Sequence, residues 1–218
     1  MSTPNYTAPD LAYAALVTID VQRDVLDGGT LGVPGTRDAL AGIERLTAWF
    51  RRAQKPIVHA IRLYSPDGRD VDLCRRSAVE QGARTLIAGS PGSQMAGALA
   101  SNAALDHELL RRGELQSLAT NEVAMYKPRW GAFYRTNLEQ HLRERAITTI
   151  VFCGANFPNC PRTSIYEASE RDFRIVLATD AISGLYERAS KELANIGVHL
   201  MNTSELLAGD SPQTVGRT

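Results

Sequence analysis

One stretch, from Thr149 to Ala181, constrains the fold of this chain more than any other. It opens with an apolar, β-branched run that ends at Gly154, which is typical of a buried strand leading into a turn. Pro161 then favours the first turn of a helix, where a residue without an N–H is tolerated. A second apolar run, over 174–178, follows that helix. The stretch therefore predicts a strand–turn–helix–strand unit, with Cys160 at the point where the helix begins.

The rest of the chain repeats this alternation of strands and helices. Strands are predicted over 12–20, 56–63, 122–126 and 198–201, and helices over 36–54, 74–81, 105–112, 136–146 and 186–196. Most of these strands are apolar throughout, which indicates a parallel sheet covered on both faces. A length of 218 residues fits one such α/β domain. We therefore predict a single domain over 1–218, with loose tails at 1–10 and 209–218.

The composition excludes several kinds of partner. The chain has 24 basic and 24 acidic residues, so its formal net charge is zero and nothing indicates binding to nucleic acid or to a membrane surface. No apolar run approaches the length of a membrane span, and the first ten residues lack the pattern of a signal peptide. The three cysteines are an odd number in a long chain, which favours free thiols in a reducing compartment. We therefore expect a cytoplasmic protein that acts on a small molecule.

Three residues with reactive side chains stand at or just beyond the ends of predicted strands. Asp20 ends the first strand, Lys127 follows a middle one, and Cys160 lies past the strand of the central unit. Sites in parallel sheets form at the carboxyl ends of the strands, so these side chains should meet. A helix N-terminus and a nearby ammonium group both lower the pKa of a thiol. A carboxylate can accept the thiol proton and return it to a leaving amine. We therefore predict a catalytic set of Asp20, Lys127 and Cys160, with a depressed pKa for the thiol.

Each of these residues also has a structural interpretation. Cys160 could be a small buried apolar side chain, Asp20 could cap the loop that follows it, and Lys127 could be solvated in a Lys-Pro turn. Their joint placement at strand ends favours the catalytic interpretation. The unpartnered N–H groups at the start of the helix could also hold the oxyanion of a tetrahedral intermediate.

Four segments resemble the isochorismatase-like cysteine hydrolases, a family that includes nicotinamidases and N-carbamoylsarcosine amidase. They are ALVTIDVQRD with Asp20, MYKPRWGAFYRTNLEQHLRERAITTIVFCG with Lys127, GANFPNCPRTSIYEASERDFRIVLATDA with Cys160, and the turn DAISG at 180–184. The resemblance implies a Rossmann-like three-layer α/β/α sandwich with a six-stranded, mainly parallel sheet. It also implies attack by Cys160 on an amide, carbamoyl or lactam carbon, loss of ammonia or an amine, and hydrolysis of a thioester acyl-enzyme.

The resemblance further implies how the oxyanion is held and how chains assemble. It assigns the oxyanion donors to the backbone N–H groups of Asn156 and Cys160, and it implies a cis peptide bond between Ala155 and Asn156. It also favours a homo-oligomer, a dimer or a tetramer. Nicotinamidases of the family carry an Asp/His/His metal site after the second strand, whereas this region holds only His59, inside an apolar strand. We therefore expect His59 to be a hydrogen-bonded core residue, and we expect neither a metal nor another cofactor.

Side chains close to these strand ends are candidates for substrate binding. Arg62 and Tyr64, past the second strand, and Gln22, past the first, could contact polar substrate groups. Aromatic residues of the loops could line a pocket for an apolar portion, although at least half of them are expected in the core. These aromatic residues are Trp130, Phe133, Tyr134 and Phe157.

Two functions are compatible with this pattern. The leading hypothesis is a cysteine-dependent amidohydrolase. The alternative is a thiol-bearing small-molecule binding or redox protein without hydrolase activity. The chain contains no Cys-x-x-Cys pair, and Cys153 lies inside an apolar strand, which disfavours the alternative.

Overall fold

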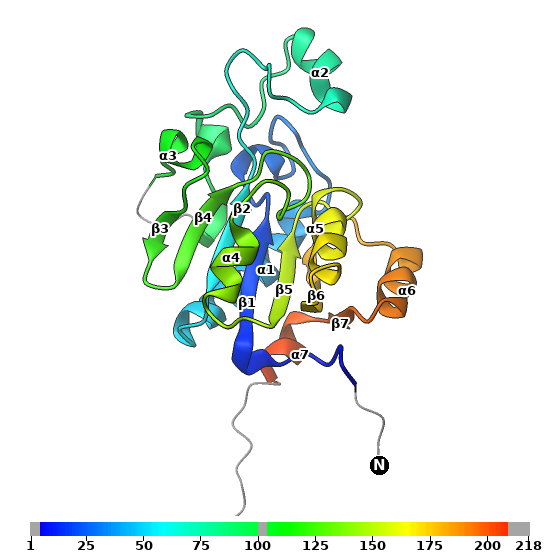
Figure 1. Ribbon diagram of the computed structural model, residues 1–218. Helices are drawn as coiled ribbons and strands as arrows, with labels where there is room; N and C mark the ends of the chain where they lie inside the picture. The colour runs from blue at the N-terminus through cyan, green and yellow to red at the C-terminus, as the bar shows by residue number, and fades with distance from the viewer. Residues whose placement is uncertain (1–4, 100–103, 209–218) are drawn as a thin grey trace, which may run out of the picture.

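A seven-stranded sheet forms the centre of the protein (Figure 1). The computed structural model describes residues 5–99 and 104–208. The strand order is β3-β4-β2-β1-β5-β6-β7, and all neighbours are parallel except β3 and β4. The strands are β1 (Ala14–Ile19), β2 (Ile57–Ile61), β3 (Gln116–Ala119), β4 (Glu122–Tyr126), β5 (Thr149–Gly154), β6 (Arg174–Ile182) and β7 (His199–Met201). The α-helices are α1 (Thr36–Arg52), α2 (Leu73–Glu80), α3 (His107–Arg111), α4 (Leu138–Arg143), α5 (Cys160–Ser169), α6 (Glu187–Asn195) and α7 (Thr203–Ala208).

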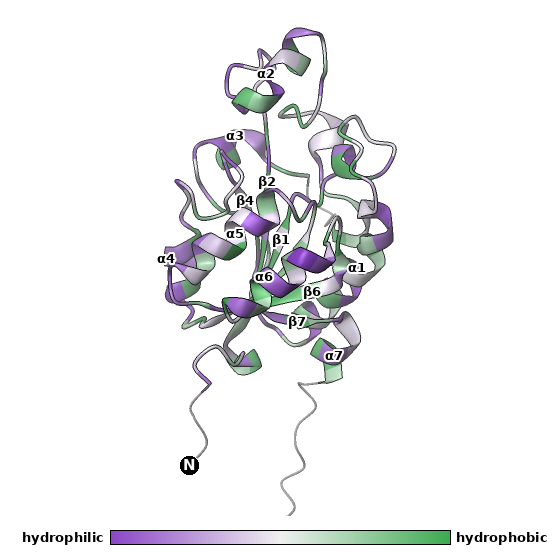
Figure 2. Cartoon of the chain, turned by 90° about the vertical axis from the view of Figure 1, so that its right-hand side faces the viewer, coloured by the Kyte–Doolittle hydropathy of each residue, from purple (hydrophilic) through white to green (hydrophobic). Residues whose placement is uncertain are grey.

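The helices cover both faces of the sheet, so the protein is a three-layer α/β/α sandwich (Figures 1 and 2). Along β1, Leu16 packs in one core with Ile43 of α1, whereas the next residue, Val17, packs in a second core with Ile165 of α5. All four side chains are fully buried, and each such burial contributes roughly 1.5–3 kcal/mol. Because both faces are buried, the central strands β1, β2 and β5 are apolar at most positions, as the sequence predicts.

The six predicted strands are all present, and a seventh is added. β3 forms an antiparallel edge next to β4, and its side chains alternate between half-buried and exposed. It is four residues long, so its sequence carries too short a pattern to indicate a strand. The sheet therefore has seven strands where the resemblance implies six. Helix α7 is likewise absent from the prediction.

The start of the described chain lies against the body of the protein. The Asp10 N–H donates to Thr149 Oγ1 at 2.9 Å, and Arg174 Nε donates to the Tyr6 carbonyl at 3.3 Å. The other residues predicted as loose tails, 1–4 and 209–218, lie outside the described residues. Within 5–99 and 104–208, no helix is both long enough and apolar enough to cross a membrane. The cytoplasmic location stays a prediction.

Helix α2 projects away from the sheet and buries none of its side chains (Figure 1). Its first residue, Leu73, is 79% exposed, and a helix this short is marginal in water without packing contacts. Contact with a second copy of the chain would supply such packing. The homo-oligomer stays a prediction, and light scattering at micromolar concentration should give the mass of a dimer or tetramer. A monomeric mass would reject it.

Gly154 allows β5 to approach β1 where both strands end. Its φ is +122°, and a Cβ at this position would lie 2.2 Å from the Ile19 carbonyl oxygen. Gly154→Ala should therefore lower the free energy of unfolding in urea by the backbone cost, about 1–3 kcal/mol, plus roughly 1–3 kcal/mol for the clash. Gly82→Ala is the matched control, because Gly82 has a φ of +102° and open space around it. Equal losses of unfolding free energy in the two variants would show that the close approach of β5 to β1 at Gly154 does not contribute.

Candidate active site

Four neighbouring strands deliver polar side chains to one edge of the sheet. Asp20 directly follows β1, Arg62 follows β2 and Lys127 follows β4. Cys160 is the first residue of α5, which the loop after β5 leads into. The adjacency of β4, β2, β1 and β5 brings these segments together, so the three residues predicted as a catalytic set do meet.

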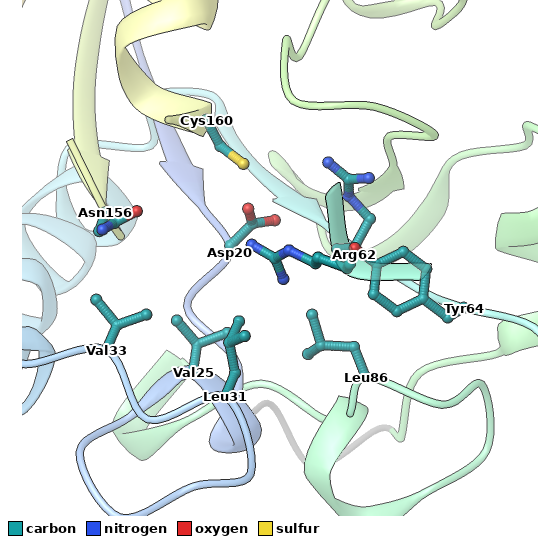
Figure 3. A pocket seen from close by; sticks show the side chains of 10 residues that line it. Asp20, Val25, Leu31, Val33, Arg62, Tyr64, Leu86, Asn156 and Cys160 are labelled. Carbon is teal, nitrogen blue, oxygen red and sulfur yellow. The ribbon is translucent and has the colours of Figure 1, made fainter. Parts of the chain in front are cut away.

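The carboxylate of Asp20 forms an ion pair with a buried lysine. Lys127 Nζ donates to Asp20 Oδ2 at 2.9 Å, and the Lys127 side chain is completely buried. Among the described residues the other carboxylate oxygen, Oδ1, has no hydrogen-bond partner. Figure 3 shows the sulfur of Cys160 directed toward this carboxylate. One oxygen is therefore held by the lysine, and the other stays available beside the thiol.

The backbone at Asp20 adopts an unusual conformation. Its φ is +51°, in the left-handed region that costs a residue with a side chain about 1–2 kcal/mol. The Asp20 N–H is held by the Ala60 carbonyl at 2.9 Å. Such conformations persist where the surrounding structure determines them, and they cluster at functional sites.

The thiol of Cys160 is not depressed in pKa, contrary to the sequence-based prediction. Burial raises its pKa to about 11, and the negative charge of Asp20 adds to this, while Lys127 and Arg62 act in the opposite direction. Cys160 is 5% exposed, so the cost of desolvating a thiolate outweighs the helix N-terminus and the two cations. The prediction of a depressed pKa is therefore wrong, and the group is a neutral thiol near pH 7.

This pKa sets an order of reactivity among the three free thiols. Near pH 7, iodoacetamide should modify the exposed Cys74 first and Cys160 slowly, because only the thiolate reacts. The Cys160 rate should rise as the pH approaches about 11. Cys153 should react last, since it is fully buried and burial raises its pKa further. Peptide mapping of the labelled protein measures the order, and faster labelling of Cys160 than of Cys74 at pH 7 would contradict the raised pKa.

The loop between β5 and α5 carries two unused backbone donors. Neither the Asn156 N–H nor the Cys160 N–H has a partner among the described residues. The loop itself is fixed on either side, because Ala155 N–H donates to the Ile19 carbonyl and Phe157 N–H to the Ser183 carbonyl. No cis peptide bond occurs in the described residues. The cis bond between Ala155 and Asn156 that the resemblance implies is therefore absent, which corrects that expectation. Asn156 and Cys160, the residues that carry the two free N–H groups, both line the cavity of the thiol.

The thiol and carboxylate lie in a small, largely covered cavity (Figure 3). Arg62, Tyr64, Arg75 and Asn156 supply its other polar lining. Its apolar cover consists of Val25, Leu31, Val33 and Leu86. The cavity holds about 20 Å³, which is room for a water molecule but not for an amide substrate. Asp24 fastens the cover, because its Oδ2 accepts from the Leu86 N–H at 2.7 Å and its carbonyl accepts from the Leu31 N–H at 2.9 Å.

Arg62 and Tyr64, both predicted to bind substrate, do line this cavity and share one carboxylate. Arg62 Nη1 and the Tyr64 hydroxyl each donate to Asp72 Oδ2 at 2.8 Å. Burial alone would raise the pKa of Asp72, but the charge of Arg62 and these hydrogen bonds lower it on balance. Sequence reasoning missed Asp72 because it sits in a stretch of mixed composition between β2 and α2. Arg75, on α2, was missed for the same reason.

Gln22 does not line the cavity. Its side chain is fully buried, its Oε1 accepts from the Arg62 N–H at 2.9 Å, and its Nε2 donates to the carbonyls of Arg62 and Ser93 at 2.9 and 2.7 Å. The amide therefore fixes the backbone of Arg62 and has little capacity left for a ligand. This corrects its predicted role in substrate binding.

The four aromatic candidates also lie away from the cavity. Phe133 and Phe157 are buried in the core beneath α5, where Phe133 packs on Phe173 and Phe157 packs on Tyr186. Trp130 and Tyr134 line a separate, open hollow next to α2. Half of the set is therefore in the core, as expected, because large rings gain most from burial.

His59 is a hydrogen-bonded core residue, as predicted. Its Nδ1 lies 2.8 Å from Thr18 Oγ1 and its Nε2 lies 2.8 Å from Glu122 Oε1. Past β2 the chain then presents Arg62 and Tyr64, and a guanidinium group cannot ligate a metal and repels one. In the part of the chain that the structure describes, no group of three or more His, Cys, Asp or Glu could hold a metal ion. These residues do not fit the metal site of the nicotinamidases.

Comparison with known proteins identifies the family of this chain. The model of the isochorismatase domain matches residues 14–205. A ureidoacrylate amidohydrolase of Methylobacterium radiotolerans is 29% identical over 226 residues, which cover 95% of this chain and 82% of that protein. A probable inactive nicotinamidase of Arabidopsis thaliana is 26% identical over 191 residues, with coverage of 84% and 89%. The crystal structure of an isochorismatase family protein from Desulfovibrio vulgaris superposes with a TM-score of 0.75 at 26% identity, covering 89% of this chain and 96% of that one. Since the family model spans most of its length, this chain belongs to the isochorismatase domain family.

Proposed function

We propose that this protein is a cysteine-dependent amidohydrolase that cleaves a C–N bond of a small amide, carbamoyl or lactam substrate. One observation supports it above the others: the Asp20 carboxylate, held by the buried Lys127, keeps an unpartnered oxygen beside the Cys160 thiol. A relative named as an amidohydrolase matches over most of the chain, which supports the same reaction class.

In the first half-reaction the thiol becomes the nucleophile only as it attacks. Asp20 accepts the proton from the Cys160 sulfur, and the sulfur bonds to the substrate carbonyl carbon. The carbonyl oxygen becomes an oxyanion, for which the N–H groups of Asn156 and Cys160 are the available donors. The C–N bond then breaks, Asp20 returns its proton to the leaving nitrogen, and a thioester remains on Cys160.

In the second half-reaction the same groups act on water. Asp20 accepts a proton from a water molecule while the oxygen of that water bonds to the thioester carbon. The C–S bond breaks, the proton passes to the sulfur, and a carboxylic or carbamic acid leaves with the thiol restored. Lys127 orients the carboxylate in both halves through its contact with Oδ2, which is 2.9 Å long in this structure.

The alternative, a thiol-bearing small-molecule binding or redox protein without hydrolase activity, has less support. Cys153, the cysteine closest in sequence, packs in the core under α1, on the opposite face of the sheet from Cys160. Cys74 is exposed on α2. A redox-sensing cysteine often has a resolving thiol beside it, but Cys74 lines a different hollow from Cys160, and Cys153 lies in a different core.

Release of ammonia or amine from a panel of amides, ureas and lactams tests the proposal. The native protein should hydrolyse members of the panel, Cys74→Ala should match it, and Cys160→Ala should lose the activity. Mass spectrometry during turnover should show the acyl group on the Cys160 peptide. Hydrolysis that survives in Cys160→Ala would refute the cysteine mechanism, and a native protein with neither release nor acylation would refute the hydrolase.

A further inference from the structure

Two side chains that line the cavity of Cys160 each keep an unpartnered polar atom. Across the described residues, three buried side-chain atoms lack a hydrogen-bond partner, and two of them are Asp20 Oδ1 and Arg62 Nε. Both residues line the cavity, and Figure 3 shows them next to each other. Native proteins rarely leave buried polar atoms unpaired, because such an atom loses its hydration without compensation. The two atoms therefore indicate a third group that satisfies both.

The two side chains do not satisfy each other directly. Oδ1 is an acceptor and Nε–H is a donor, yet no ion pair or hydrogen bond joins Asp20 to Arg62 in the described part of the chain. Their charges do interact, because burial works against the charge of Arg62 but its acidic neighbours, Asp20 foremost, raise its pKa on balance. Polar groups that are too far apart for a direct bond but close enough to interact are commonly bridged by a water molecule.

The cavity has the size and the lining that one buried water molecule requires. Its volume of about 20 Å³ exceeds the minimum for a single water. A buried water also needs several polar partners, and here Arg62 Nε offers a donor, Asp20 Oδ1 offers an acceptor and the Cys160 sulfur lies in the same space. A water that accepts from Nε–H and donates to Oδ1 keeps one lone pair free for another bond.

Arg62 is held in place independently of such a water. Its backbone N–H donates to Gln22 Oε1 and its carbonyl accepts from Gln22 Nε2, both at 2.9 Å. At the far end of the side chain, Nη1 donates to Asp72 Oδ2 at 2.8 Å and to the Pro128 carbonyl at 3.2 Å. These contacts fix the guanidinium group and leave its Nε unused. A water bound to Nε would therefore have a defined position, which favours reaction.

We propose that this cavity is the site of the hydrolytic water, which Arg62 Nε–H holds against Asp20 Oδ1 for attack on the thioester. The inference rests on the proposed hydrolase function and gives Arg62 a role in the second half-reaction. Asp20 takes one proton of the water while the water oxygen bonds to the thioester carbon, the C–S bond breaks, and the proton passes to the sulfur. Arg62 transfers no proton. Its cation stabilises the negative charge that develops on the water oxygen.

A crystal structure of the native protein, at a resolution that shows ordered water, tests the site without any variant. One water should lie within hydrogen-bond distance of both Arg62 Nε and Asp20 Oδ1. In Arg62→Lys, which keeps a cation for Asp72 but has no Nε–H, this water should be displaced or lost. A direct hydrogen bond between Arg62 and Asp20 in the native protein, or a cavity without water, would overturn the proposal.

Separate rates of acylation and deacylation test the role of the water. With the best amide of the panel, rapid quenching and mass spectrometry should show that Arg62→Lys acylates Cys160 at close to the native rate. The variant should hydrolyse the thioester about 10- to 100-fold more slowly, the usual effect of one hydrogen bond to a charged group, so the acyl-enzyme should accumulate. Hydroxylamine attacks a thioester without this water, so it should restore turnover in Arg62→Lys more than in the native protein. Arg76→Lys, the same change at an exposed position, should match the native protein.

The outcomes separate this inference from the proposed function. Circular dichroism checks that the variants are folded. Acylation and deacylation that fall equally in Arg62→Lys would indicate a structural role only, and unchanged rates would remove Arg62 from the reaction. Either result overturns the inference and leaves the hydrolase standing. A native protein that no member of the panel acylates would refute the hydrolase itself, and a water seen in the crystal would then be structural.

Discussion

Asp20→Asn is expected to lower kcat by about 100- to 10,000-fold, the usual contribution of a positioned proton-transfer group. The thiol has a pKa near 11, so almost none of it is thiolate at pH 7, and attack depends on a base within reach. Asparagine keeps the size and one carbonyl acceptor for Lys127, but it cannot take a proton. Steady-state turnover on the best substrate of the panel measures the loss. Asp38→Asn, an exposed residue of α1, is the control and should be unaffected.

The same step predicts that the losses will not add. Asp20 and Cys160 serve one proton path, so a double variant should be no slower than Cys160→Ala alone. Thermal unfolding shows whether each variant is still native. Near-normal kcat in Asp20→Asn would remove the carboxylate from the mechanism, and so would a double variant that shows the full product of the two losses.

Lys127→Met is expected to lower the free energy of unfolding by about 3–5 kcal/mol, the cost of breaking a buried ion pair from one side. The lysine is fully buried and Asp20 is nearly so. In the native protein Lys127 Nζ lies 2.9 Å from Asp20 Oδ2. Removing the ammonium group leaves the buried Asp20 carboxylate without this cation. Turnover should fall as well, because the carboxylate loses the contact that orients it.

Two comparisons make this result specific to the buried pair. Lys191→Met removes an exposed partner of Glu187 on α6, and exposed pairs contribute little, so its unfolding curve in urea should overlay that of the native protein. Combining Lys127→Met with Asp20→Asn removes both charges and should recover much of the lost stability. A Lys127→Met variant as stable as Lys191→Met would contradict a large contribution of the buried ion pair to stability.

The sequence predicted which residues meet, because that follows from order alone. Asp20, Lys127 and Cys160 each follow an apolar run, and in a parallel sheet every such run ends at the same edge. The sign of the thiol pKa was not predictable in this way. A helix N-terminus can be read from Pro161, whereas the burial that outweighs it comes from segments far away in the chain.

The residues that surround the catalytic set were harder to predict than the catalytic set itself. Asp72 accepts a hydrogen bond from Arg62, ten residues earlier in the chain. The segment between them is irregular, so no periodic pattern in the sequence predicts this contact. Gln22 looked like a ligand-binding residue because it follows a strand end. Its role depends on three hydrogen bonds to the backbone of other loops, which only the folded chain brings together.

The closed cover over Cys160 has a kinetic consequence. A space of 20 Å³ admits no amide, so we expect a substrate to reach the thiol only when the segments bearing Leu31 and Leu86 move apart. We expect the association rate constant of the substrate to fall below the usual range, because encounters with the covered form of the site are unproductive. The rate at which the Asp24–Leu86 hydrogen bond opens would then govern how often a substrate molecule enters.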